Sequence, residues 1–128
     1  MKNYLERLRF AIDIRAKHSA VKITLQHQEQ VQEYSLERGS NTIIFDIIIY
    51  DPGEHKLVLN ILECIGILKI CDLRINGLSV GLGIYNCVYT TKSNISKNNI
   101  LALGEQGHWT YSCDTPVHEH TKWRIGLV

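Results

Sequence analysis

Two histidines near the C-terminal end are the residues best suited to metal chemistry. His118 and His120 are two positions apart, and such residues point to one face of an extended strand. Two imidazoles on one face can share a metal ion, to which His108 or Asp114 would add a third ligand. The alternative is an exposed polar loop that follows Pro116. We favour the loop, and therefore expect no metal site.

Nucleophilic catalysis finds little support in the residue pattern. A reactive cysteine needs a nearby base and a lowered pKa. Cys113 is close to His118 in sequence, but no helix start or cationic neighbour is indicated around it, so we interpret it as a packing thiol. No G-x-S-x-G motif occurs, and the glycines from Gly77 to Gly83 lack the lysine of a phosphate-binding loop. The sequence therefore predicts no catalytic residues.

Aromatic side chains in the C-terminal half are the feature best suited to ligand binding. Trp109 and Tyr111 share one face of a predicted strand. Trp123 falls on a neighbouring strand, and Tyr85 and Tyr89 precede a loop. Flat rings stack on the apolar faces of sugars, while nearby Asn, Asp and Gln side chains bind the hydroxyls. These rings predict a carbohydrate site; the alternative is that they pack in the core.

The elements that must position these residues are short β-strands. Apolar residues alternate with polar ones, or occupy both faces, as expected for strands that are partly or fully buried. The segments with this pattern are 8–14, 21–25, 31–36, 42–50, 56–62, 68–75, 78–84, 109–113 and 122–128. Asp46 interrupts the apolar run 42–50, and we interpret it as a charge that keeps this run soluble. About eight to ten short strands at spacings of about ten residues are typical of a sandwich or barrel.

Glycine, proline and asparagine mark the turns between these strands. Asp51-Pro52-Gly53-Glu54 predicts a hairpin that joins the two central apolar strands. Asn76-Gly77 predicts a two-residue hairpin turn. A change in the phase of the apolar residues predicts a β-bulge near Cys71-Asp72. Residues 90–99 are predicted to form a long surface loop.

Composition narrows the class of protein. The chain has 128 residues, enough for one domain with a substantial core, and 45% of them are hydrophobic. Its 14 Lys and Arg against 13 Asp and Glu give a net charge of +1, which attracts nucleic acid or an anionic membrane only weakly. The first residues lack the apolar core of a signal peptide, so we expect a cytoplasmic or virion-associated protein with reduced cysteines.

An ordered series of short motifs resembles a known group of proteins. The motifs are Gly53-Glu54-His55-Lys56-Leu57, Asp72-Leu73-Arg74-Ile75-Asn76-Gly77-Leu78, Gly104-x-x-Gly107-His108-Trp109, Thr115-Pro116-Val117 and Trp123. The series is similar to small β-sandwich proteins of marine phages and related environmental sequences, which in turn resemble carbohydrate-binding modules of jelly-roll type. The resemblance covers the chain from about Val21 and implies a module without catalytic residues. It also implies a structural calcium, but no dense run of Asp and Asn supplies an oxygen cage, so we expect no cofactor.

These observations predict a non-catalytic, all-β binding domain. We expect one antiparallel two-sheet β-sandwich of jelly-roll type over residues 1–128, with a glycan or a protein surface as its partner and with neither nucleic acid nor membrane. Two alternatives remain open. One is a structural protein that assembles into a homo-oligomer, and the other is a small metal-dependent enzyme that uses His118 and His120.

Overall fold

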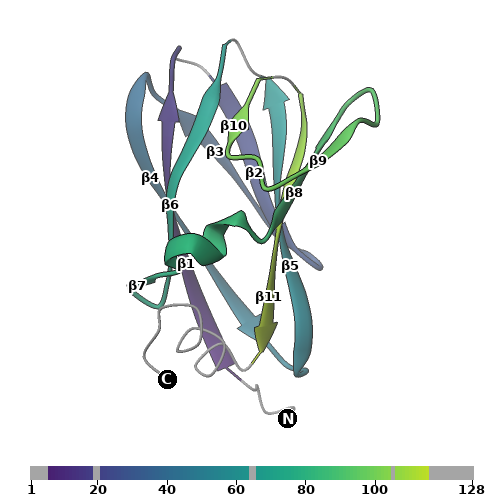
Figure 1. The fold of residues 1–128 in the computed structure, drawn as a ribbon. Coiled ribbons are helices and arrows are strands. Elements are labelled where there is room, and N and C mark those ends of the chain that lie inside the picture. The colour runs from purple at the N-terminus through teal and green to yellow at the C-terminus, as the bar shows by residue number, and fades with distance from the viewer. Residues whose placement is uncertain (1–5, 19–20, 64–65, 105, 116–128) are drawn as a thin grey trace.

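Two antiparallel β-sheets pack face to face, as Figure 1 shows, so the predicted two-sheet sandwich is confirmed. The structure is a computed structural model that describes residues 6–18, 21–63, 66–104 and 106–115. Its elements in chain order are β1 (Glu6–Ala16), β2 (Val21–His27), β3 (Gln30–Leu36), β4 (Gly39–Ile49), β5 (Gly53–Glu63), β6 (Leu68–Ile75), β7 (Leu78–Ser79), the 3-10 helix η1 (Gly81–Tyr85), β8 (Cys87–Thr91), β9 (Ser96–Asn98), β10 (Ala102–Leu103) and β11 (Gly107–Thr115).

The strands divide into two sheets by hydrogen bonding. Sheet A has the order β10-β6-β1-β4, with β7 also paired to β6. Sheet B has the order β3-β2-β5-β11-β8-β9. The β8–β9 turn projects from one corner of the sandwich (Figure 1). No helix among the described residues is long and apolar enough to cross a membrane.

Alternation along each strand buries one face of each sheet. On β1, Leu8, Phe10 and Ile12 are almost fully buried, and the residues between them are more exposed. On β11, Trp109 and Tyr111 are fully enclosed in the same core. Each large apolar side chain that is buried in this way contributes about 1.5–3 kcal/mol of transfer free energy. The interior between the sheets is therefore filled by side chains.

The prediction of a hairpin at residues 51–54 is wrong. The turn is present, but it carries the chain from β4 in sheet A to β5 in sheet B. β4 pairs with β1 along its whole length, whereas β5 lies between β2 and β11. Proline and glycine specify that the chain turns, but not which strand becomes the partner. Placing the two apolar runs in opposite sheets lets each bury its inner face against the other sheet.

The predicted bulge and the Asn76-Gly77 turn are confirmed. Asp13 is opposite Asp72 and Ile14 is opposite Ile70, so Cys71 is the extra residue of the bulge. Asn76 and Gly77 have φ angles of 52° and 86°, and they connect β6 to β7. Positive φ at both central positions is the requirement that this residue pair meets most readily.

Two other local predictions need correction. The segment 78–84 forms a strand only at Leu78–Ser79, after which the chain turns into η1. Val80 already has φ and ψ angles of −77° and −7°, and Gly81 follows with a φ of +56°, so the extended run ends before the glycine. Residues 90–99 are not an open loop, because they form the end of β8, a turn, and β9, which pairs with β8 as a hairpin. Asn94 takes a φ of 64° in the turn of this hairpin.

Candidate functional site

A row of polar side chains crosses the outer face of sheet B. Thr24 is paired with Asn60, and Asn60 is paired with His108. His108 is in turn paired with Thr90, and Thr90 with Ser96. Along β2, β5 and β11 the neighbours Ile23, Leu25, Leu59, Ile61 and Trp109 are buried, so the row faces away from the core. We call these five residues the polar row.

A depression of about 480 Å³ lies over the polar row, and we call it the sheet B groove. Its lining combines hydroxyl, amide and imidazole groups with one lysine and one exposed leucine. The lining residues are Thr24, Asn60, Ile61, Leu62, Thr91, Lys92, Asn94, Gln106, Gly107 and His108. None of these described lining residues is an aspartate or a glutamate.

Hydrogen bonds and one close backbone approach hold the shape of the sheet B groove. Asn60 Nδ2 donates to Thr24 Oγ1 at 3.2 Å, and Gln106 Nε2 donates to the carbonyl oxygen of Leu62 at 2.7 Å. At Gly107, a Cβ would lie 2.2 Å from the carbonyl oxygen of Thr90, so β11 approaches β8 this closely only because glycine is present. The amide carbonyls of Asn60 and Gln106 form no hydrogen bond with another described residue and can accept one from a ligand.

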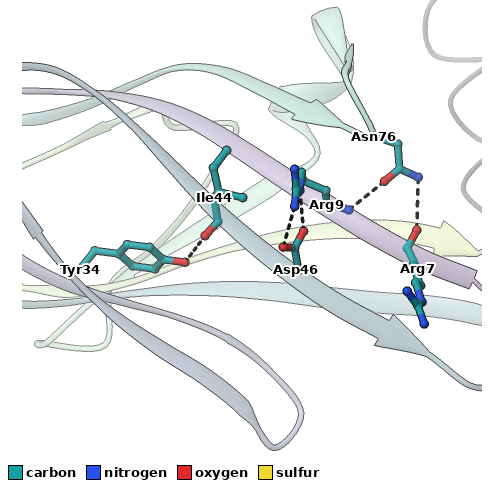
Figure 2. A network of polar contacts seen from close by, with 6 residues as sticks. All are labelled: Arg7, Arg9, Tyr34, Ile44, Asp46 and Asn76. Carbon is teal, nitrogen blue, oxygen red and sulfur yellow. Dashed lines mark hydrogen bonds and ion pairs between the residues drawn. The ribbon is translucent and has the colours of Figure 1, made fainter.

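The outer face of sheet A holds charged groups that already bind one another. Arg9 donates from Nε to Asp46 Oδ1 at 2.8 Å and from Nη2 to Oδ2 at 3.1 Å, as Figure 2 shows. Asn76 Oδ1 accepts the backbone N–H of Arg9 at 2.8 Å. The hydrogen bond from Arg9 lowers the pKa of Asp46 and keeps it ionised. A depression of about 550 Å³ borders this network, and Arg9 and Asp46 line it while they are bonded to each other.

A buried histidine pair lies on the inner face of sheet B, and the sequence analysis did not identify it. His27 and His55 are 2% and 8% exposed, and His27 Nε2 is 2.9 Å from His55 Nδ1. His55 Nε2 lies 2.7 Å from the carbonyl oxygen of Asp51, which can only accept. In the neutral pair, His55 therefore donates to Asp51 and accepts from His27, and His27 Nδ1 has no hydrogen-bond partner among the described residues. Burial, and then the proximity of His55, lower the pKa of His27.

The structure separates the aromatic residues that the sequence put forward as a ligand platform. Trp109, Tyr111 and Tyr89 are 0%, 0% and 5% exposed, so for them the core alternative describes their position. The Trp109 indole N–H donates to the carbonyl oxygen of Ile100 at 3.1 Å inside the sandwich. Rings enclosed in this way present no face to a sugar. Tyr85 is 44% exposed, and Trp123 lies outside the described residues.

Tyr85 is not close to the sheet B groove. It ends η1, and the next residue, Asn86, hydrogen-bonds to the backbone of Ser112 on β11. Ser112 is four residues along β11 from His108, a separation on the order of 13 Å in a strand. The sequence reasoning therefore missed the polar row, and the named rings that the structure describes lie beneath it or beyond it.

The candidate metal and nucleophile positions also lie apart. His108 and Asp114 are both exposed and lie near opposite ends of β11, while His118 and His120 are outside the described residues. In the described part of the chain, no three His, Cys, Asp or Glu side chains are grouped to hold a metal ion. Cys113 is buried, and burial raises the pKa of its thiol to about 12. The thiol is therefore protonated at neutral pH, as expected for a packing residue.

A calcium cage does not fit the carboxylates that the structure describes on sheet A. Asp46 is engaged by Arg9, and Asp13 accepts from Arg74 at 3.0 Å. Asp72 accepts from the Ser79 hydroxyl at 2.8 Å. Calcium needs about six to eight oxygen ligands that point to one position, and several carboxylate and carbonyl groups must come together to supply them. Each of these carboxylates instead accepts hydrogen bonds from its own neighbours.

Comparison with known proteins finds similarity in structure alone. No family model matches the chain, and no curated protein matches it. A calcium-dependent carbohydrate-binding module, vCBM60 in its selenomethionine form, superposes with a TM-score of 0.56 at 14% identity over 81% of this chain and 89% of that chain. The same module in complex with galactobiose gives a TM-score of 0.53 at 14% identity over 80% of this chain and 96% of the other. The described chain therefore shares the two-sheet fold of these modules.

Proposed function

We propose that this protein is a non-catalytic carbohydrate-binding module that holds its glycan in the sheet B groove. The observation that carries the proposal is a groove of hydrogen-bonding groups, neutral apart from Lys92 among the described lining residues, on a fold shared with a module solved in complex with galactobiose. Asn60, Gln106 and His108 offer amide and imidazole groups to sugar hydroxyls. The exposed side chain of Leu62 offers an apolar contact to the carbon skeleton of a sugar ring.

The expected affinity follows from the small number of these contacts. A neutral hydrogen bond contributes about 0.5–1.5 kcal/mol net, because it replaces a bond to water. Three or four such bonds total about 4 kcal/mol, which corresponds to a dissociation constant on the order of 1 mM. The binding is therefore best measured by NMR titration, which detects weak complexes residue by residue.

A titration with a panel of oligosaccharides that includes galactobiose tests the proposal. We expect amide shifts at residues 60, 92 and 106–108, and we expect Asn60→Ala to weaken binding about tenfold, since about 1.4 kcal/mol is tenfold. Asn98→Ala is the matched control, because Asn98 is exposed on β9 of the same sheet but does not line the groove. Binding that persists in a calcium chelator is expected, because no described lining residue supplies a carboxylate to hold calcium. No response to a broad panel would overturn the proposal.

Assembly into a homo-oligomer is a second candidate function, and the free edge of β4 favours it. Among the described strands only β1 pairs with β4, although β4 has 11 residues and carries the exposed Ile44. Tyr34 donates its hydroxyl to the backbone carbonyl of Ile44, as Figure 2 shows. This carbonyl lies on the edge of β4 that faces away from β1, where every second residue directs its backbone groups outward. Long apolar edges pair readily with a second strand. Light scattering at working concentration tests this: a strict monomer contradicts assembly and leaves glycan binding untouched.

A further inference from the structure

We infer that the glycan bound in the sheet B groove is acidic, a chain of uronic acid residues whose carboxylate pairs with Lys92. This inference rests on the proposed function and adds the chemical class of the sugar. Three features of the groove carry it: the charge of its lining, the fixed geometry around Lys92, and the absence of aromatic rings from the described lining residues.

The charge of the lining is one-sided. Lys92 contributes a cation, and no described lining residue carries a carboxylate, although the whole chain is nearly balanced at 14 cationic against 13 acidic residues. Elsewhere in the described structure, Arg9, Arg74 and Lys56 each lie within 4.0 Å of a carboxylate. The Lys92 side chain forms no ion pair or hydrogen bond with another described residue. A carboxylate on the ligand would supply a partner that the described lining residues do not.

The backbone around Lys92 is fixed before a ligand arrives. The N–H of Lys92 donates to the carbonyl oxygen of Gln106 at 2.9 Å, which ties the β8–β9 turn to the start of β11. Within this turn, Asn94 N–H donates to the Thr91 carbonyl at 2.9 Å, and Thr91 is only 7% exposed. Lys92 and Asn94 are thus carried into the groove on an ordered turn, which reduces the entropy that binding must overcome.

The chemistry of the lining limits how a neutral sugar can bind. The aromatic rings of β8 and β11, Tyr89, Trp109 and Tyr111, are on the inner side of sheet B and contribute no stacking surface. Binding must then come from polar contacts and from the single leucine. Charge-assisted hydrogen bonds are roughly twice as strong as neutral ones. An acidic sugar therefore gains more from this groove than a neutral sugar of the same shape.

A matched pair of ligands tests the inference. The titrants are digalacturonate and its dimethyl ester, which has the same sugar skeleton but carries a methyl group in place of each negative charge. We expect digalacturonate to bind about tenfold more tightly than the ester. Lys92→Gln should remove this difference, while Lys97→Gln should preserve it, because Lys97 is exposed on β9 and does not line the groove. Raising the salt from roughly 20 mM to roughly 500 mM should weaken binding of the acid and spare the ester.

The outcomes separate the inference from the function on which it rests. If the ester binds as tightly as the acid, or Lys92→Gln leaves their difference unchanged, the acidic specificity is wrong and glycan binding stands. If neither compound nor any neutral oligosaccharide of the panel shifts the groove amides, the proposed function itself fails.

Discussion

The outer face of sheet A carries ion pairs between neighbouring strands, whereas the groove on the outer face of sheet B is lined, among the described residues, by neutral polar groups and one lysine. On sheet A, Arg9 is bound to Asp46 and Arg74 to Asp13 across neighbouring strands. On sheet B, the polar row is uncharged apart from its imidazole, and Lys92 beside it has no described partner. Exposed ion pairs add only about 0–1 kcal/mol to stability. The contrast supports the proposed placement of the ligand on sheet B, where no ion pair joins the described lining residues of the groove.

The largest effect that sharpens this comparison is expected beneath the polar row. Trp109→Ala should lower the free energy of unfolding by about 3–5 kcal/mol, because it empties a fully buried site in the core. His108→Ala, one residue earlier but on the outer face, should change it by less than about 0.5 kcal/mol. Urea denaturation of both variants measures the difference. Equal losses of unfolding free energy in the two variants would contradict the assignment of Trp109 to the core and His108 to the outer face.

Acid should lower the free energy of unfolding through the buried histidine on the inner face of sheet B. The pKa of His27 is lowered in the folded protein, so the unfolded chain takes up a proton at higher pH than the folded one. The contribution of neutral His27 to stability is complete above the pKa of histidine in the unfolded chain, about 6.5. It is lost as the pH falls below this value, at up to about 1.4 kcal/mol per pH unit. Protonation would place a charge on buried His27, whose Nδ1 has no partner among the described residues.

His27→Leu provides the control for this pH dependence. Leucine suits the alternating pattern of β2, where Val21, Ile23 and Leu25 occupy the same buried face. The slope of unfolding free energy between pH 6.5 and pH 5 should be shallower in this variant than in the wild type. Identical slopes would show that other groups dominate the acid response.

The smallest effect is expected on the face that pairs its own charges. Asp46→Asn removes the ion pair with Arg9 at a surface site where both side chains are more than half exposed. Stability should fall by at most about 1 kcal/mol, and glycan affinity at the sheet B groove should not change. A loss of binding in Asp46→Asn would reverse the comparison and locate the ligand on sheet A.

The sequence predicts the strands of this fold better than their partners. Alternation of apolar residues is a local property, and so are the Cys71 bulge and the Asn76-Gly77 turn, which the structure confirms. The partner of β4 is not local: only burial of both sheets decides that β4 pairs with β1 and that β5 joins the other sheet. The hairpin predicted at residues 51–54 was wrong for this reason.

The site was harder to predict for the same physical reason. Thr24, Asn60 and His108 are far apart in the sequence, and only the register of β2, β5 and β11 places them side by side. The histidine pair, in contrast, had a signal in the sequence. His27 continues the buried positions of Val21, Ile23 and Leu25, so extending the alternation by one step would have placed it in the core.

The position of β11 in sheet B has a consequence for how the protein is made. Residues 107–115 enter the sheet between β5 and β8, which lie tens of residues earlier in the chain. During synthesis the earlier strands must wait for this segment, with the edge of β5 exposed, before the sheet can close. Such distant pairings slow folding to the order of milliseconds to seconds. Among the described strands, β11, which carries His108, is the last to be synthesised, so substitutions that disturb its pairing should reduce the yield of folded protein.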